Sequence, residues 1–241
     1  MSTYYSFDWT MWLMRNFPLT IYFHDIATYL PSYLKFGYEQ RNVMTELMTN
    51  LLHVNLSSPE LKNRATLIGN MTKPGSSRNG APLPESALLD EAIGVMHGGV
   101  LDISNVLPYG TFHLAQDLKS QQTLYEELKQ VWEDPAGPIP DYEILRKLPY
   151  LRGVVKESLR CTHGVISGMP RVVTANGATI DGNFIPPKTI VATSSFYVHM
   201  DPTVFPEPEK FDPERWATDD PQLERAFVPF SKGRRMCPAS K

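Results

Sequence analysis

The sequence predicts a mainly helical protein with a small β-sheet toward its C-terminus. Apolar residues recur at helical spacing over most of residues 1–164, which predicts helices. From Val165 onward, short runs rich in β-branched residues alternate with turn residues, which predicts a few short strands. With 241 residues, 42% of them hydrophobic and 20% charged, the chain can bury a sizeable core in one or two domains.

Charge and the N-terminal sequence argue against several classes of function. The net charge is −3, and no stripe of lysine and arginine interleaved with aromatics offers a surface for nucleic acid. The N-terminal stretch MSTYYSFDWTMWLMRNF lacks the pattern of a signal peptide and the run of about eighteen apolar residues that a membrane anchor needs. Cys161 and Cys237 are therefore expected to be reduced thiols of a cytosolic chain.

The first part of the chain, residues 1–84, is expected to hold helices and a loop. Helical spacing covers residues 1–66 with a break near Pro31. The stretch KPGSSRNGAPLP at residues 73–84 has the glycine, proline and serine content of a loop.

The middle part, residues 85–164, is expected to be helical throughout its length apart from short connections. A long apolar helix starts near residue 85, and Gly98-Gly99 and Pro108 are expected to interrupt it. SQQTLYEELKQVWED predicts an amphipathic helix, and DYEILRKLPYLRGVVKESLRCTHG predicts a short helix and a second one ending near Gly164.

The last part, residues 165–241, is expected to hold the sheet and an irregular segment. MPRVVT, ATIDGNFIP and KTIVATSSFYVH read as strands, with Asp181-Gly182 as a hairpin turn. From Met200 the chain is rich in proline yet contains several aromatics, which predicts a packed coil rather than a disordered tail. This coil delivers Cys237 close to the end of the sequence.

Two motifs place arginine where it could bind a carboxylate. Glu157 and Arg160 in KESLR lie on one helical face, where they form either an ordinary surface ion pair or a structural one. Arg215 follows in PERW, within the aromatic-rich coil, and a planar guanidinium can dock on a carboxylate and hold such a coil.

A third motif, FSKGRRMC, contains Phe230-x-x-Gly233-x-Arg235-x-Cys237. With E-x-x-R and P-E-R before it, in this order and at these separations, the chain resembles the cytochrome P450 family of haem-thiolate monooxygenases. GVVKESLR, HGVISGMPRVV and FSKGRRMC look closest to filamentous-fungal members that oxidise terpenoids and other secondary metabolites, such as trichothecene-pathway oxygenases.

The resemblance implies that Cys237 is the axial ligand of haem b iron. A soft thiolate pushes electron density onto the iron, and nearby positive charge favours the deprotonated form. Gly233 permits a tight turn beside the porphyrin, and Phe230 would shield the sulfur from water. Three basic residues supply this positive charge: Lys232, Arg234 and Arg235. Arg235 would also pair with a haem propionate.

By the same resemblance, residues before and within the first strand face the cofactor. Arg171 would bind the second propionate, or it is an exposed arginine at the start of an ordinary strand. Three preceding residues would line the substrate space: Val165, Ile166 and Ser167.

The family's oxygen-activating motif falls on the long central helix, and here the pattern departs. Gly98 and Gly99 match its glycines, but Leu101 stands at the acid position and Asp102 at the alcohol position. A carboxylic acid in an apolar pocket can act as a general acid, so Asp102 is either a proton donor or the mark of a decayed site.

The resemblance implies the C-terminal portion of the cytochrome P450 fold, incomplete at both ends. Its parts are pocket-roof helices and a loop (1–84), the central and following helices (85–164), and the sheet, coil and ligand loop (165–241). Missing are the membrane anchor, the first half of the helical domain and the helix after the ligand, where Pro238 and Ala239 stand.

The implied reaction inserts one oxygen atom from O2 into a small apolar substrate, with electrons from NADPH through NADPH-cytochrome P450 reductase. The family works on the cytosolic side of the endoplasmic reticulum, and without an anchor this chain is expected in the cytoplasm. The alternative is a non-catalytic remnant with weak or no haem binding. A zinc or cysteine-hydrolase site has little support, because neither cysteine has C-x-x-C spacing.

Overall fold

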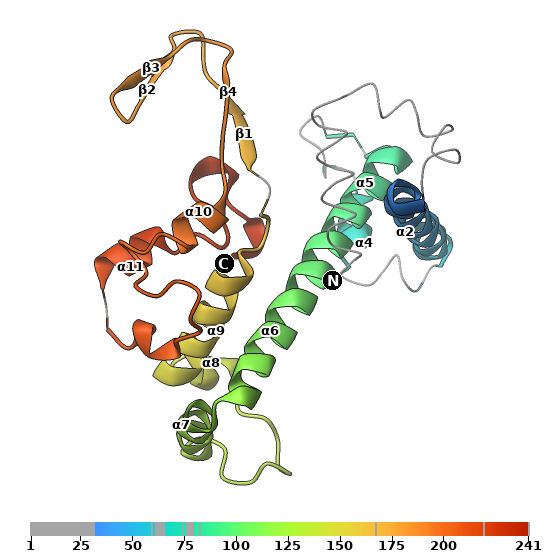
Figure 1. The fold of residues 1–241 in the computed structure, drawn as a ribbon. Helices are drawn as coiled ribbons and strands as arrows, with labels where there is room; N and C mark the ends of the chain where they lie inside the picture. Colours follow the sequence, from blue (N-terminus) through green and yellow to red (C-terminus); the bar gives the residue numbers. More distant parts are fainter. Residues whose placement is uncertain are drawn as a thin grey trace. The chain divides into compact units, whose positions relative to one another are not determined.

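The computed structural model describes residues 32–58, 60, 66–73, 75, 80–81, 83–166, 168–218 and 220–240. It divides into two compact units, Met1–Leu101 and Asp102–Lys241. The elements labelled in Figure 1 are mostly helices, with four short strands. The predicted class, mainly helical with little sheet, is confirmed.

The described part of the first unit is built on two helices. α2 (Ser32–Ser57) packs against α5 (Glu85–Met96), and the short α4 (Leu67–Met71) contacts both. Three apolar side chains on these helices are buried: Met48, Leu52 and Leu88. The predicted break near Pro31 lies outside the described residues. No helix among those described is long and apolar enough to span a bilayer.

The central helix is more continuous than the sequence predicts. After α5 come a π-helical segment, η2 (His97–Asp102), and then α6 (Ile103–Gln116), so that residues 85–116 are helical throughout. Gly98-Gly99 widens the helix into a π turn instead of ending it, and Pro108 lies inside α6. A proline removes one backbone hydrogen bond, which the flanking turns of a long helix can tolerate. The α-helix is therefore interrupted at Gly98-Gly99 as predicted, although by a π turn, whereas the predicted interruption at Pro108 is wrong.

The helices of the second unit follow the prediction closely. They are α7 (Leu118–Lys129), the four-residue α8 (Tyr142–Leu145) and α9 (Pro149–Thr162). α9 is the central element, because it contacts α6, α7 and a 3-10 turn, η3 (Pro213–Trp216), from the C-terminal segment. Figure 1 shows α9 between α6 and the C-terminal segment.

A side chain of α7 caps the N-terminus of α9 and so joins the two helices. Leu148, the residue before α9, has no side-chain oxygen to satisfy the first free N–H groups of the helix. The carboxylate of Glu127 on α7 accepts both N–H groups instead, from Tyr150 and Leu151, at 2.8 Å each. The negative charge also complements the partial positive charge of this helix end.

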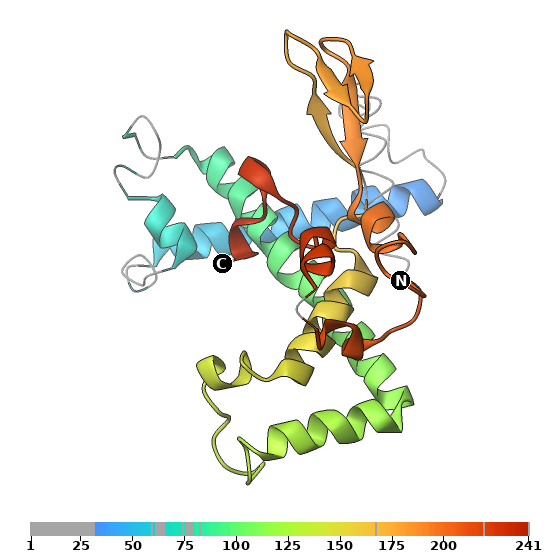
Figure 2. The same cartoon turned by 90° about the vertical axis from the view of Figure 1, so that its left-hand side faces the viewer.

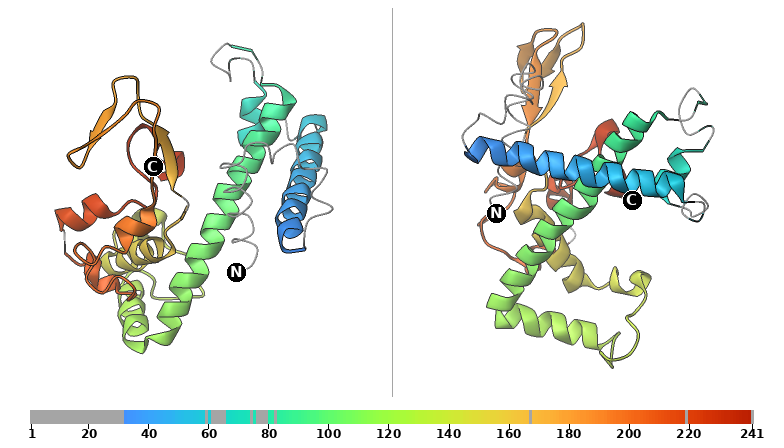
Figure 3. Two further views of the ribbon diagram at one scale, coloured as in Figure 1. Left: turned by 45° about the horizontal axis from the view of Figure 1, so that its top comes forward. Right: turned by 90° about the vertical axis from the view of Figure 1, so that its right-hand side faces the viewer.

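The strands form two small antiparallel sheets and not one. β1 (Met169–Val172) pairs with β4 (Ile190–Thr193), and β2 (Ala178–Ile180) pairs with β3 (Asn183–Ile185). They extend away from the helices of their unit, as Figures 2 and 3 show. The predicted hairpin turn is confirmed: Ile180 pairs with Asn183, and Asp181 and Gly182 both have positive φ, 48° and 75°.

The C-terminal segment is a packed coil, as predicted. Phe205, Trp216 and Leu223 are buried together, with Val204, Ala226 and Phe227 against them. The sequence analysis missed the short helices in it: α11 (Pro221–Ala226), η4 (Gly233–Arg235) and η5 (Pro238–Ser240). The predicted strand KTIVATSSFYVH is wrong in its second half, because β4 ends at Thr193 and the side chain of Ser194 caps a helix, α10 (Ser195–His199). For η3 and α11 the signal was present, since an aspartate before a proline is an N-cap followed by the favoured first helical residue.

Gly153 is needed for the contact between α9 and η3. A Cβ atom at this position would lie 2.7 Å from the carbonyl oxygen of Pro213, which is backbone and cannot rotate away. We expect Gly153→Ala to lower the free energy of unfolding by about 1–3 kcal/mol, measured by urea unfolding followed by circular dichroism. Gly94→Ala in α5 is the control, because a Cβ there meets nothing within 4 Å. Equal effects of the two substitutions would contradict the close contact.

Candidate functional site

Glu157 and Arg160 form a buried bidentate pair on α9. Arg160 Nε donates to Oε2 of Glu157 at 2.9 Å, and Nη2 donates to Oε1 at 2.8 Å. Both side chains are 0% exposed. The surface ion pair that the spacing alone allowed is therefore wrong for this motif. A buried pair of this kind is tolerated only when its remaining hydrogen-bonding capacity is satisfied.

That capacity is satisfied by the C-terminal coil. Glu157 accepts hydrogen bonds from the indole Nε1 of Trp216 at 2.8 Å and from the backbone N–H of Asp212 at 3.1 Å, and Arg215 Nε lies 3.5 Å from Oε1. Arg160 donates to three backbone carbonyls of the coil: His199 at 2.9 Å, Pro208 at 2.8 Å and Lys210 at 3.2 Å. The structure thus brings Glu157, Arg160 and Arg215 together, and the cluster fastens the coil to α9.

The groups around this cluster have shifted pKa values. Burial alone would lower the pKa of Arg160, but its hydrogen bonds to Glu157 and the charge of that carboxylate outweigh burial and raise it. Burial, and next the nearby charge of Glu157, raise the pKa of Cys161 to about 11. Cys161 therefore stays a neutral thiol at neutral pH, in keeping with the interpretation as a small core residue.

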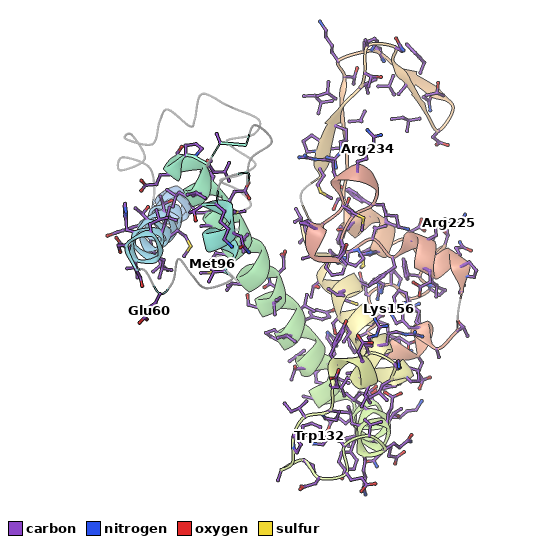
Figure 4. All side chains as sticks on the ribbon, turned by 180° about the vertical axis from the view of Figure 1, so that it is seen from behind. Glu60, Met96, Trp132, Lys156, Arg225 and Arg234 are labelled. Atoms are coloured by element: carbon purple, nitrogen blue, oxygen red, sulfur yellow. The ribbon has the colours of Figure 1, made fainter. Side chains whose placement is uncertain are left out.

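A second cation extends the cluster on the outer side. The ammonium group of Lys156 lies 5.1 Å from the ring centroid of Trp216 and 5.7 Å from that of Phe227, and it also pairs with Glu224. Figure 4 labels Lys156 on α9, where it faces the C-terminal segment. The amphipathic lysine side chain closes the aromatic core while its charge reaches solvent.

The loop from Phe230 to Cys237 is closed by its own backbone. The N–H of Cys237 donates to the carbonyl of Phe230 at 2.9 Å, and the N–H of Met236 donates to the carbonyl of Gly233 at 3.1 Å. Gly233 has a φ of 80°, a conformation that favours glycine, and open space lies where a Cβ would stand. Cys237 is a free, half-buried thiol at the end of this loop. Phe230 is 36% exposed, and its role as a shield of the sulfur stays a prediction.

In the sequence, three basic residues precede Cys237 and a short turn follows it. Lys232, Arg234 and Arg235 are exposed, and the ammonium group of Lys232 donates to the carbonyl of Arg225. Arg234 and Arg225 are both labelled in Figure 4. After the thiol, the carbonyl of Cys237 accepts a hydrogen bond from Oγ of Ser240 at 2.8 Å, within the single 3-10 turn η5.

The remaining residues expected at the cofactor keep the status of predictions. Arg171 is exposed on β1, and its Nη1 donates to the carbonyl of Pro170 at 2.8 Å. Val165 and Ile166 are 46% and 40% exposed, which leaves their apolar surface open to a ligand. Ser167 lies outside the described residues.

The residues that match the family's oxygen-activating motif lie on the π-helical segment η2. Gly98 and Gly99 belong to the first unit, and nothing lies within 4 Å of where their Cβ atoms would stand. Asp102 is the last residue of η2, begins the second unit and is half-buried. Its role as a proton donor stays a prediction.

Sequence reasoning missed one residue of the site, His199. It is 0% exposed at the end of α10, and its Nε2 accepts a hydrogen bond from the backbone N–H of Val228 at 3.0 Å. Burial, then the nearby His163 and Arg160, lower the pKa of His199 to about 4, so the imidazole is neutral at neutral pH. The one available signal was a histidine inside the apolar stretch SSFYVHM.

These residues fit a haem group bound through sulfur. A free thiol, a glycine turn that lets backbone come close, and arginines suited to carboxylates are the donor set that an iron porphyrin requires. Fold and loop together define a mainly helical protein with a free thiol, Cys237, at the end of a loop closed by its own backbone. The family model described as cytochrome P450 matches residues 2–238, and the chain belongs to this family. Membership implies haem as the cofactor and argues against the zinc and hydrolase alternative.

Comparison with known proteins agrees with this assignment. The chain is 41% identical to cytochrome P450 monooxygenase ppzG of Metarhizium majus, over 97% of this chain and 84% of that one. It is 31% identical to cytochrome P450 monooxygenase flvC of Aspergillus flavus, over 93% of this chain but 42% of that one. The predicted resemblance to filamentous-fungal members is confirmed.

A solved structure shows the same fold. Retinoic acid bound cyanobacterial CYP120A1 matches with a TM-score of 0.71 and 24% identity, covering 86% of this chain and 47% of that one. The chain therefore has part of the cytochrome P450 fold, spanning about half the length of that protein.

Proposed function

We propose that this chain is a haem-thiolate monooxygenase that inserts one oxygen atom from O2 into a small apolar substrate, such as a terpenoid or another secondary metabolite. NADPH would supply the electrons through NADPH-cytochrome P450 reductase, on the cytosolic side of the endoplasmic reticulum or in the cytoplasm. When bound, haem supplies the activation of O2, and the thiolate favours cleavage of the O–O bond. The relatives whose names are cytochrome P450 monooxygenase support this proposal.

The loop that ends in Cys237 carries the proposal. Its closure by the Cys237 N–H to the carbonyl of Phe230 fixes the backbone on which the free thiol sits. Arg235 and Arg171 would hold the haem propionates, and Val165, Ile166 and Ser167 would contact the substrate. Asp102 would hold and donate a proton at its carboxyl group, and the Glu157, Arg160 and Arg215 cluster would keep the coil before the loop in place.

Cys237→Ser tests the ligand directly. We expect the full chain, expressed with haem, reduced and exposed to carbon monoxide, to show the Soret band of a thiolate-bound haem, and Cys237→Ser to lose that band completely because a serine hydroxyl does not replace a thiolate. Cys161→Ser is the matched control, since the thiol of Cys161 stays protonated. A spectrum unchanged by Cys237→Ser would overturn the assignment of the ligand.

A non-catalytic remnant is the second candidate, and the residues at 101 and 102 favour it. The acid position of the oxygen-side motif holds leucine, which moves no proton, and the alcohol position holds Asp102. NADPH consumption by the haem-loaded chain in the presence of the reductase separates the two candidates. A chain with the thiolate band but no consumption above that of the reductase alone is a remnant.

A further inference from the structure

His199 links the buried cluster on α9 to the chain that precedes the ligand loop. Its backbone carbonyl accepts a hydrogen bond from Arg160 Nη1 at 2.9 Å, and its imidazole Nε2 accepts one from the N–H of Val228 at 3.0 Å. The ring is stacked on Phe227 and makes a T-shaped contact with Phe205, each at 6.1 Å between centroids. Two aromatic contacts therefore hold the imidazole while Nε2 accepts the N–H of Val228.

Two further backbone hydrogen bonds lie between Val228 and Cys237. The carbonyl of Val228 accepts the N–H of Ser231 at 3.0 Å, and the carbonyl of Phe230, one residue before, accepts the N–H of Cys237 at 2.9 Å. Ser231 has a φ of 62°, an uncommon conformation for a residue with a side chain, which neighbouring structure must hold in place. The placement of the loop thus depends on where residue 228 is held.

The hydrogen bond from Val228 to His199 requires one protonation state and one tautomer of the imidazole. Nε2 can accept a hydrogen bond only when it carries no proton, so the single proton of the neutral ring is on Nδ1. Nδ1 of His199 is buried beside the backbone of Arg160, whose hydrogen-bonding contribution raises the pKa of the ring against the larger effect of burial.

We propose that His199 is a positioning residue for the thiolate: its neutral imidazole holds the N–H of Val228 and so sets the backbone from which the ligand loop starts. The inference deepens the proposed function and rests on Cys237 being the ligand. The buried Glu157–Arg160 pair holds the carbonyl of His199, so His199 connects this pair to the residue from which the ligand loop starts.

The substitutions are chosen to separate hydrogen bonding from packing. His199→Gln places an amide oxygen close to the position of Nε2 and keeps the acceptor. His199→Phe keeps an aromatic ring in the same core and removes the acceptor, and His199→Asn keeps a polar amide whose oxygen falls short of that position. Phe205→Leu is the packing control, because Phe205 contacts the His199 ring but takes no part in the hydrogen bonds to Val228.

The first readout needs no haem. In the apo chain carrying Cys161→Ala, which leaves Cys237 as the sole thiol of the sequence, we measure alkylation of Cys237 by iodoacetamide and amide hydrogen exchange at Val228, Ser231 and Cys237. His199→Phe and His199→Asn are expected to raise exchange at these amides by about tenfold, the factor that the loss of one hydrogen bond implies, and to speed alkylation. His199→Gln is expected to stay within about twofold of the parent chain.

The second readout uses the haem-loaded chain and the carbon monoxide band. His199→Phe and His199→Asn are expected to move a large share of the band away from the thiolate position, whereas His199→Gln and Phe205→Leu keep it. If His199→Phe does not fold, His199→Gln and His199→Asn still compare a polar side chain that keeps the acceptor with one that does not. Equal amide exchange and equal spectra in His199→Gln and His199→Asn would overturn the positioning role. Loss of the band in Cys237→Ser together with equal behaviour of Gln and Asn would leave the proposed function standing and sink this inference alone.

Discussion

Glu157→Gln is expected to destabilise the second unit by about 3–5 kcal/mol, the range seen when one partner of a buried ion pair is removed. The substitution keeps the shape of the side chain but leaves the charge of Arg160 buried without a counter-charge. It also replaces one of the oxygens that bind Arg160 and the C-terminal coil by an NH2 donor, which faces other donors. A small domain has about 5–15 kcal/mol of stability, so this one change removes a large fraction of it.

Urea unfolding followed by circular dichroism measures the effect, and a shift in the midpoint at an unchanged slope gives the free-energy difference. Glu214→Gln is the control, because Glu214 also pairs with a cation, Lys119 at 2.8 Å, but on an exposed surface. Such a pair contributes at most about 1 kcal/mol. If the two substitutions shift the midpoint by similar amounts, the Glu157 cluster does not hold the coil in the way the hydrogen bonds indicate.

The E-x-x-R motif shows how far sequence reasoning reaches. Spacing placed Glu157 and Arg160 on one helical face, and the structure agrees. Whether that face is buried depends on donors and carbonyls about 40 to 60 residues further along the chain, which no local pattern encodes. The order of the motifs supplied the family, and the family match supports that step.

Other features were missed for the same physical reason. Glycine and proline lower helix propensity locally, but Gly98-Gly99 and Pro108 lie in a helix whose remaining turns are kept, and a π turn accommodates the pair of glycines. The proposed role of His199 depends on one hydrogen bond that its imidazole accepts from the backbone N–H of Val228, 29 residues further along the chain. Turn chemistry is local, which is why the hairpin at Asp181-Gly182 was predictable.

The stability of the second unit is expected to fall as the pH drops from about 6.5 to about 4, and His199 is the main cause. Its pKa is lowered from 6.5 to about 4 in the fold, chiefly by burial. Below pH 6.5 the unfolded chain therefore takes up a proton that the folded chain refuses, and protonation favours unfolding. The stability contributed by the neutral imidazole is fully present above pH 6.5, the pKa of the unfolded chain, and is lost as the pH falls toward about 4, the pKa in the fold. One pKa unit corresponds to about 1.4 kcal/mol, so the loss amounts to about 3 kcal/mol. The pKa of the neighbouring His163 is also lowered, mainly by burial, and acts in the same direction.

Urea unfolding of the parent chain and of His199→Gln at pH 7.5, 5.5 and 4.5 isolates this contribution. Gln keeps an acceptor for the N–H of Val228 and does not titrate, so the variant is expected to lose clearly less stability than the parent between the first and last pH. The carboxyl groups are the same in the two chains, so their contribution to the change of stability with pH cancels in the comparison. Parallel curves for the two chains would mean that His199 is not held neutral by the fold, because a protonated ring could not accept the hydrogen bond from Val228.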